Sequence, residues 1–532
     1  MKKGISISMK RMTVILVVLT MLLAGCSSTK NPVTTTGGSE SNNTTTASTA
    51  AATEAPKPLE VVIARAFDVA GMDPGFLKEN AQVVDNIFDR LIMRDTEMKL
   101  VPGLATEWST VDELTWEFKL RKGVKFHNGE DFNAAAVKYS IDRVLNPANN
   151  APTLSYIKTV DRVEVVDDYT VRVITKTSDP LIPTRFSRYP TEIVPPKYVD
   201  EVGKDVFAQK PVGTGPYKFV EWVKDDRVVL EANKDYWNGA PEVTKVTWRS
   251  IPESSTRNGA LLAGEVDIAT PIAPQDISSV SASDKVRISK VERGGNIVYV
   301  GLKTEEKPFN DVRVRQALNY AIDKDSIVKN VLTETAVRTS SMIGPKDFGY
   351  DGEPAGYAYD PEKAKKLLAE AGYANGFETT LDCVNWYIKC TDVGQAISAQ
   401  LAQVGIKVKV NSVESTVYRT SVPGKKQAPM YFLGWSSTNS LDADAAIFAV
   451  LHSGEAYSTY SNPEVDTMLD KARSSTNEAE RKTLYSDIQK KVIEDAPRIF
   501  LYQENKYIGV SNKIQWEGRI DDAIPVATMK AK

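Results

Sequence analysis

Residues that carry out acid–base or nucleophilic chemistry are scarce in this chain of 532 residues, which has two histidines, His127 and His452, and three cysteines. A Ser-His-Asp triad needs a histidine beside its nucleophile, and a histidine-rich zinc site needs several. The motifs HExxH, GxSxG and GxxxxGK[ST] are absent. Carboxylates are plentiful, but no pair of them is marked as catalytic. We therefore expect a protein that is not an enzyme and that binds no metal or cofactor.

One stretch, PVGTGPYKF from Pro211 to Phe219, has two glycines spaced as in a dinucleotide-binding loop. Pro216 and the missing third glycine argue against that function, because such a loop must open a helix with free backbone N–H groups. A Gly-Pro turn is the better interpretation.

Cys383 and Cys390 are too far apart for CxxC redox chemistry, and no neighbouring cysteine or histidine completes a zinc site. Two alternatives stay open for this pair, a disulfide or two free thiols, because the sequence does not give their Cα separation.

The first 25 residues have the pattern of an export signal. Four cations, Lys2, Lys3, Lys10 and Arg11, precede an apolar segment that is too short for a bilayer span of roughly 20 residues. The segment ends in Leu-Ala-Gly-Cys, which resembles the lipobox of bacterial lipoproteins. That resemblance implies cleavage before Cys26 and lipid attachment to it, so the mature protein is expected to be anchored to the outer side of the cell membrane by lipid.

The segment after the cysteine, 26–57, is rich in Ser, Thr, Asn, Ala and Gly and is expected to be a disordered tether. Without residues 1–25 the chain has 62 cationic and 69 anionic side chains, a net charge of −7. Such a balance argues against nucleic acid as a partner. The roughly 475 remaining residues are enough for two or three lobes.

Predicted strands and helices alternate along the rest of the chain. We expect strands at 59–67 and 115–126 and a hairpin over 162–176. A helix is expected after Asn133, with Phe132 and Val137 forming a hydrophobic staple. Further helices are indicated by apolar spacing and by cap residues, at Val314 to Ile322, after Asn462 with Pro463, and after Asn477 with Glu480 as a capping box. The mixture indicates an α/β protein.

Eight strings occur in the order and spacing of one known family. They are GLATEW, WEFKLRKGVKFHNGEDFNAAAVKYSIDRV, PVGTGPYKF, YWNG, LLAGEVDI, PFNDVRVRQALNYAIDKDSI, DPEKAKKLLAEAGY and YSNPEVDTMLDKA. Between Leu59 and about Lys513, the chain thus resembles the family 5 extracellular solute-binding proteins, the peptide- and nickel-type receptors of ABC importers.

The resemblance implies an α/β, two-lobed clamp like the periplasmic binding proteins of type II, cluster C, which closes on its ligand by hinge motion. It also implies domain boundaries. Lobe I is expected over 58–298 plus 500–532, with an inserted subdomain at about 98–206, and lobe II over 299–499. Both crossovers, GGNIVYVGL and PRIFLYQEN, are apolar and β-prone, as suits strands that run between lobes.

The same resemblance points to ligand contacts in two stretches of lobe II, CVNWYIKC and FLGWSSTNSLDAD. In the family, the matching segments line the ligand cleft. The expected contacts are Asn385, Trp386, Tyr387, Trp435, Thr438 and Asn439. For each aromatic residue the alternative is packing in the core, because Trp and Tyr are largely buried in most proteins.

From lobe I we expect Arg65, Phe67 and Asp68 at the cleft, where a strand runs into a loop. A solvated strand charge is the alternative for Arg65. Arg185 and Arg188, in TRFSRYP, are weaker candidates of the same kind, for which surface charges are the preferred interpretation.

One departure from the family concerns the kind of ligand. Peptide-binding members have an aspartate a few residues after the Gly-Trp of the second stretch, which pairs with the ligand's α-ammonium group. Here that position is Thr438, and a hydroxyl supplies no charge. Either Asp442 takes the role, or the ligand has no free amino terminus. An opine, a glutathione-like compound or an oligosaccharide therefore stays open beside a short peptide, and nickel is disfavoured because neither histidine lies in these stretches.

Two function classes follow from these observations. The first is a lipid-anchored, monomeric receptor that captures a short peptide or peptide-like solute by lobe closure and delivers it to the permease subunits of an ABC importer. The second is a surface lipoprotein hydrolase or sensor built on the same clamp.

Overall fold

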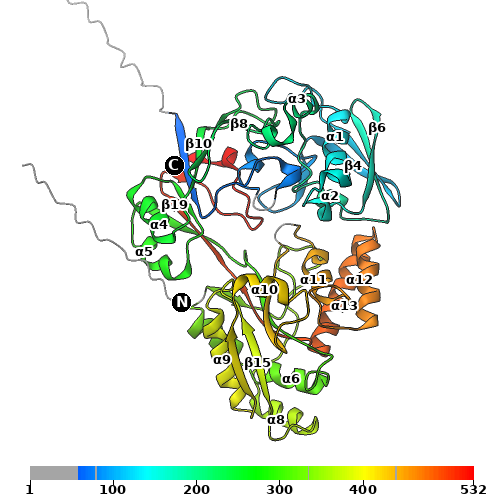
Figure 1. Cartoon of the computed structure of the whole chain (residues 1–532), viewed down its shortest axis with the longest axis vertical. Coiled ribbons are helices and arrows are strands. Elements are labelled where there is room, and N and C mark those ends of the chain that lie inside the picture. Colours follow the sequence, from blue (N-terminus) through cyan, green and yellow to red (C-terminus); the bar gives the residue numbers. More distant parts are fainter. Residues whose placement is uncertain (1–57, 78–80, 334, 438–439) are drawn as a thin grey trace, which may run out of the picture. The chain divides into compact units, whose positions relative to one another are not determined.

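A seven-stranded sheet joins the beginning, middle and end of the chain in the computed structural model, which describes residues 58–77, 81–333, 335–437 and 440–532. Its spatial order is β12-β19-β11-β1-β10-β9-β8, and β1 pairs in parallel with both β10 and β11. The strands are β1 (Leu59–Arg65), β8 (Tyr217–Val223), β9 (Arg227–Ala232), β10 (Val243–Ser250), β11 (Ile268–Thr270), β12 (Val286–Val291) and β19 (Lys506–Ser511). Figure 1 shows β19, coloured for the end of the chain, beside strands coloured for its beginning and middle.

Smaller elements lie between β1 and β8. A four-stranded sheet in the order β4-β5-β7-β6 packs against helix α1, and a two-stranded hairpin, β2 and β3, precedes it. The elements are β2 (Ile92–Arg94), β3 (Leu100–Pro102), β4 (Ala105–Asp112), β5 (Thr115–Leu120), α1 (Ala134–Leu145), β6 (Val160–Asp167), β7 (Thr170–Thr175), α2 (Ile182–Arg185) and α3 (Pro196–Phe207). The strand expected over 115–126 ends at Leu120, because the chain turns at Gly123, whose φ is 78°.

A six-stranded sheet, in the order β14-β18-β13-β17-β15-β16, forms the centre of the other half of the fold. Its strands are β13 (Ile297–Leu302), β14 (Ala336–Arg338), β15 (Glu378–Cys383), β16 (Lys407–Ser412), β17 (Met430–Trp435) and β18 (Arg498–Glu504). Every residue of β13 and β18 is buried, which explains why both read as nearly continuous apolar runs. The helices are α6 (Val312–Tyr320), α8 (Pro361–Glu370), α9 (Cys390–Ala402), α10 (Ser415–Ser421), α11 (Ala443–Leu451), α12 (Pro463–Ser474) and α13 (Glu478–Asp495).

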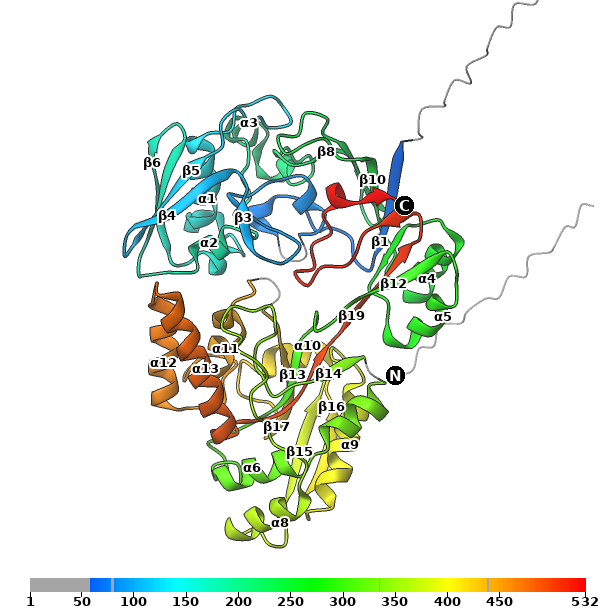
Figure 2. The same ribbon diagram turned by 180° about the vertical axis from the view of Figure 1, so that it is seen from behind.

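Separate apolar cores lie around the two large sheets. One core is made of side chains from 298–502, and a second lies wholly within 91–193. The other two combine side chains from 61–291 with the C-terminal segment from Tyr507 onward. We call the half with the seven- and four-stranded sheets the first lobe and the half with the six-stranded sheet the second lobe. The chain passes between them after β12 and again between β18 and β19 (Figure 2).

The predicted helix caps are present. Asn133 accepts a hydrogen bond from the Ala136 N–H, and both staple residues, Phe132 and Val137, are buried in one core. At α13 the capping box takes a modified form. The Asn477 side chain accepts from the N–H groups of Ala479 and Glu480, but the Glu480 carboxylate binds the Ser475 hydroxyl, which accepts from the Asn477 N–H.

Among the described residues, polar contacts away from the linking strands also join the two lobes. The Arg94 guanidinium donates to the Ser440 carbonyl oxygen at 2.6 Å, and the Ser178 hydroxyl donates to the Ser474 carbonyl oxygen at 2.7 Å. Lys346 forms an ion pair with Glu97 at 3.1 Å. Among the described residues, no helix is long and apolar enough to cross a membrane.

Candidate ligand-binding site

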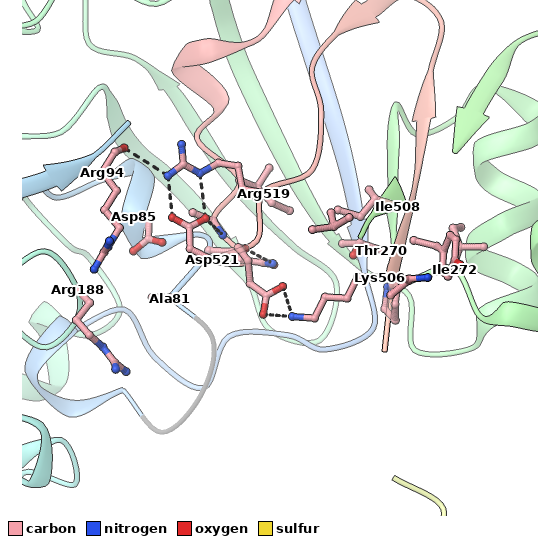
Figure 3. Close-up of a pocket in the computed structure, with 18 of the residues that line it drawn as sticks. Ala81, Asp85, Arg94, Arg188, Thr270, Ile272, Lys506, Ile508, Arg519 and Asp521 are labelled. Carbon is pink, nitrogen blue, oxygen red and sulfur yellow. Dashed lines mark hydrogen bonds and ion pairs between the residues drawn. The ribbon is translucent and has the colours of Figure 1, made fainter. Parts of the chain in front are cut away.

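A cavity of about 660 Å³ lies where β19 passes from one lobe to the other. Its wall is made mostly by the first lobe, through residues 81–94, 187–189, 270–274 and 519–524, and by the start of β19 at 505–508. The second lobe contributes Trp386 and Ile388, from the loop after β15. Segments more than 400 residues apart in the sequence therefore share one wall (Figure 3).

Several cations of this wall have carboxylate partners. Arg90 pairs with Asp85 and, at 2.6 Å, with Glu192 behind it. Arg519 binds both oxygens of Asp521, at 3.0 and 2.7 Å, as Figure 3 shows.

Lys506, also in the wall, pairs with Asp522 at 2.5 Å. The wall thus presents charges of both signs, suited to a ligand that carries both.

Two other cations of the wall have no ion pair with the described residues. Arg94 donates to the carbonyl oxygens of Met98 and Ser440, at 2.7 and 2.6 Å. Arg188 lies with its guanidinium carbon 4.5 Å from the ring centre of Tyr156 and 5.0 Å from that of Tyr189. Burial lowers the pKa of both guanidinium groups from its ordinary value.

Apolar side chains complete the wall. Pro271, Ile272, Val291 and Ile508 line it from the seven-stranded sheet and its loops. Trp386 faces it from the second lobe and is 40% exposed, which is high for so large an apolar residue. Its ring meets Tyr418 edge to face at 5.7 Å, which fixes its orientation.

The neighbours of Trp386 do not line this cavity. Asn385 is exposed and accepts a hydrogen bond from Ser415 at 2.8 Å. Tyr387 is buried against β17, where a Cβ atom on Gly434 would lie 2.5 Å from its ring. Burial raises the pKa of Tyr387.

In the second expected stretch of lobe II, the described residues Trp435 and Asp442 do not line this cavity. Trp435 donates to the Ala445 carbonyl oxygen at 2.8 Å and borders a small internal void. Asp442 is buried, caps α11 and binds Arg481 at 2.9 and 3.1 Å. Thr438 and Asn439 lie outside the described residues.

The residues expected from lobe I are also away from the cavity wall. Arg65 is buried over Trp248, with its guanidinium carbon 5.9 Å from the ring centre, and donates to the Phe67 carbonyl oxygen at 2.9 Å. Phe67 is 65% exposed, and Asp68 accepts hydrogen bonds from Trp222 and from the Asp225 N–H.

Sequence reasoning missed most of the charged wall. For Arg188, a weaker cleft candidate, a surface charge was the preferred interpretation, but its Nε and Nη2 atoms are buried. Its contact with the Tyr156–Tyr189 pair has one sequence signal, a cation beside a tyrosine in a turn-rich segment. No local signal marks Arg94, Lys506, Arg519 or the two aspartates that follow Arg519.

The two histidines, Cys383 and Cys390 make contacts within the fold and do not line the cavity. His127 is bonded through Nε2 to the Gly215 carbonyl oxygen at 2.9 Å and so holds the PVGTG turn, and burial lowers its pKa to about 4. His452 stacks on Phe448 with ring centres 4.6 Å apart. Cys383 and Cys390 are buried free thiols. Of the two alternatives left open by the sequence, a disulfide or two free thiols, the structure has the free thiols. No cluster of three or more His, Cys, Asp or Glu side chains in the described part of the chain is arranged to hold a metal ion.

Comparison with known proteins now identifies the family. Residues 99–458 match the bacterial extracellular solute-binding proteins, family 5 (Middle). The chain belongs to this family. It is 36% identical over 472 residues to the glutathione-binding protein GsiB of Pectobacterium atrosepticum, covering 86% of this chain and 90% of that protein. It is 32% identical over 463 residues to GsiB of Escherichia coli, covering 84% of this chain and 89% of that protein.

Solved structures agree with this family 5 assignment. HbpA2 from Haemophilus parasuis superimposes with a TM-score of 0.81 at 25% identity, covering 89% of this chain and 100% of that one. The periplasmic binding protein DppA of Helicobacter pylori, in complex with the peptide STSA, gives 0.71 at 28% identity, with 88% and 98% covered. The predicted two-lobed α/β fold is therefore confirmed.

The family also confirms the transport role in the first function class. Family 5 proteins bind solutes, and this chain is the extracytoplasmic substrate-binding protein of an ABC importer, working with permease subunits.

Proposed function

We propose that this family 5 receptor captures glutathione or a closely similar short anionic peptide in the cavity beside β19. The observation that carries the proposal is the 36% identity to a glutathione-binding protein over 86% of the chain. The related DppA of Helicobacter pylori, in complex with the peptide STSA, supports the same chemical class.

The cavity is compatible with such a ligand. Its volume of about 660 Å³ falls in the range of roughly 300–1,000 Å³ that small-molecule sites occupy. Glutathione carries two carboxylates and one ammonium group, and the wall carries cations and carboxylates among apolar side chains. A transport receptor must also release its ligand, and a Kd near 1 μM, or about −8 kcal/mol, would suffice.

Of the expected contacts in lobe II, we propose Trp386 as a wall of the ligand site. Asp442 is engaged by Arg481, so an ammonium group would have to displace a buried arginine to bind it. We propose instead that the ligand's ammonium group is received near Asp522, which lines the cavity and whose ion pair with Lys506 is much more exposed than the Asp442–Arg481 pair.

We further propose that the lobes divide at about 298 and 500 and close on the ligand as a clamp. The passages between sheets, after β12 and between β18 and β19, would then be the hinge. The chain is proposed to act as a monomer, held at the membrane by lipid on Cys26, which lies outside the described residues.

The ligand class is tested with the purified mature protein and a panel of glutathione, oxidised glutathione, a tetrapeptide, an opine and a trisaccharide. We expect glutathione to raise the melting temperature and to be recovered unchanged by mass spectrometry. Stabilisation by the sugar or opine alone would contradict the peptide class. Cleavage of glutathione would favour the hydrolase alternative.

The anchor is tested separately in cells. Replacing Cys26→Ala should move the protein from the membrane fraction to the soluble fraction and abolish labelling by a radioactive fatty acid. An unchanged distribution with no label in the parent protein would contradict lipid anchoring.

A further inference from the structure

We propose that Arg188, with Arg94 beside it, is the anchor for a carboxylate of the ligand. The inference rests on the proposed function, because it assigns a role within the same cavity, and it adds the residue that selects for the ligand's negative charge.

The surroundings of Arg188 are those of a cation without a counter-ion. Its Nε and Nη2 atoms are buried and have no hydrogen-bond partner among the described residues. Tyr156 and Tyr189, whose ring centres are only 5.3 Å apart, lie together on one side of the guanidinium group and do not enclose it. Buried donors without partners are costly, so a site that keeps them is one that a ligand completes.

The balance of charge in the wall singles out the same pair. Arg519 and Lys506 are each neutralised by an aspartate, and Arg90 by Asp85 and Glu192. Arg94 and Arg188 are the lining cations left without an ion pair to the described residues.

The chemistry of these groups favours a carboxylate. A planar guanidinium offers parallel N–H groups that match the two oxygens of a carboxylate, and such charge-assisted bonds are about twice as strong as neutral ones. Figure 3 shows both arginines on the same side of the cavity, with the Arg519–Asp521 and Lys506–Asp522 pairs further along it. A zwitterionic peptide with surplus negative charge fits this order of charges, and an uncharged sugar does not.

The test combines a change in the protein with a change in the ligand. Binding of glutathione and of its diethyl ester, which lacks both carboxylate charges, is measured by calorimetry for the parent protein, Arg188→Gln and Arg188→Lys. The matched control is Arg162→Gln, which removes an exposed arginine of the same lobe outside the cavity. Melting temperatures without ligand verify that each variant is folded.

We expect Arg188→Gln to weaken glutathione binding about 10- to 100-fold, the range for a hydrogen bond to a charged group. The diester should bind the parent protein as weakly as glutathione binds Arg188→Gln, and the variant should weaken the diester little further. Arg188→Lys should restore part of the affinity, because it keeps the charge but not the paired geometry. The control should bind like the parent protein.

The outcomes separate the two proposals. If the parent protein binds no glutathione or peptide, the proposed function fails. If the parent protein binds glutathione and Arg188→Gln binds it equally well while folded, the anchor is wrong and the proposed function stands. If Arg188→Gln lowered the affinity for glutathione and for its diester equally, the anchor would also be overturned, because Arg188 would then contact the ligand without recognising its negative charge.

Discussion

At the scale of single residues, Asp442 caps helix α11 and binds Arg481 through both carboxylate oxygens. Both side chains are almost completely buried, with exposed fractions of 4% and 5%. The aspartate that was considered as a replacement for Thr438 in ligand binding thus holds two parts of the second lobe together. A buried pair of this kind is sensitive to the loss of one partner, because the other is left as an isolated charge.

We expect Asp442→Ala to lower the free energy of unfolding by about 3–5 kcal/mol, measured by urea denaturation. The matched control is Glu378→Ala, which removes one partner of an exposed pair with Lys407 and should cost less than about 1 kcal/mol. A loss for Asp442→Ala no larger than that of the control would show that the buried pair does not stabilise the fold.

Asp347 makes stability depend on pH. Its buried carboxylate accepts from the Ser437 hydroxyl at 2.5 Å and the Gly344 N–H at 2.6 Å, and burial raises its pKa from 3.8 to about 6. Between these values the folded state holds a proton that the unfolded state has lost. Stability from this group is therefore present at low pH and falls as the pH rises through about 6.

The variant Asp347→Asn should remove this dependence. We expect the stability difference between about pH 4 and about pH 7 to shrink by roughly 3 kcal/mol relative to the parent protein. Ser437→Ala removes a donor to the charged form, so it should move the transition to higher pH. Identical pH profiles for the parent protein and Asp347→Asn would contradict the shift.

At the scale of secondary structure elements, helix α1 shows why the sequence predicted some features so well. Its start depends on Asn133 and on the Phe132–Val137 staple, all within five positions of one another. Such signals join residues that are close in sequence, so they form independently of how distant segments pack. The strand expected over 115–126 was too long because β-propensity continued past the turn at Gly123.

The cap of α1 gives a prediction at this scale. Asn133→Ala should lower the free energy of unfolding by about 1 kcal/mol, since the Ala136 N–H loses its acceptor. Asn330→Ala, an exposed residue that is not a cap, is the control and should change stability by less than about 0.5 kcal/mol. Equal effects in a denaturant titration would argue against the cap.

At the scale of the whole molecule, the lobes touch through a few polar contacts outside the strands that link them. The Lys346–Glu97 ion pair is exposed on both sides, with side-chain exposures of 49% and 66%. An exposed pair contributes little to the stability of a fold, but it acts directly on the balance between open and closed clamp because it joins the two lobes.

Reversing one charge should therefore weaken ligand binding. We expect Lys346→Glu to reduce glutathione affinity about two- to fivefold at low salt, and the loss to vanish in about 0.5 M salt. Lys407→Glu reverses a charge whose partner, Glu378, lies in the same lobe, so it should leave affinity unchanged. A loss that persists at high salt would indicate a cause other than repulsion between the lobes.

The sequence by itself determined the export pattern at the start, the helix caps, the alternation of strands and helices, and the family. These features depend on residues a few positions apart, because the hydrogen bonds, charges and apolar spacing that produce them act over short stretches of the chain. Only the tertiary structure decided which side chains line the cavity. Arg188, Trp386 and Asp521 come from segments far apart in the chain, and their meeting depends on how the sheets and loops pack. The same packing placed Arg188 against the Tyr156–Tyr189 pair and Asp442 against Arg481, two outcomes that no local pattern contains.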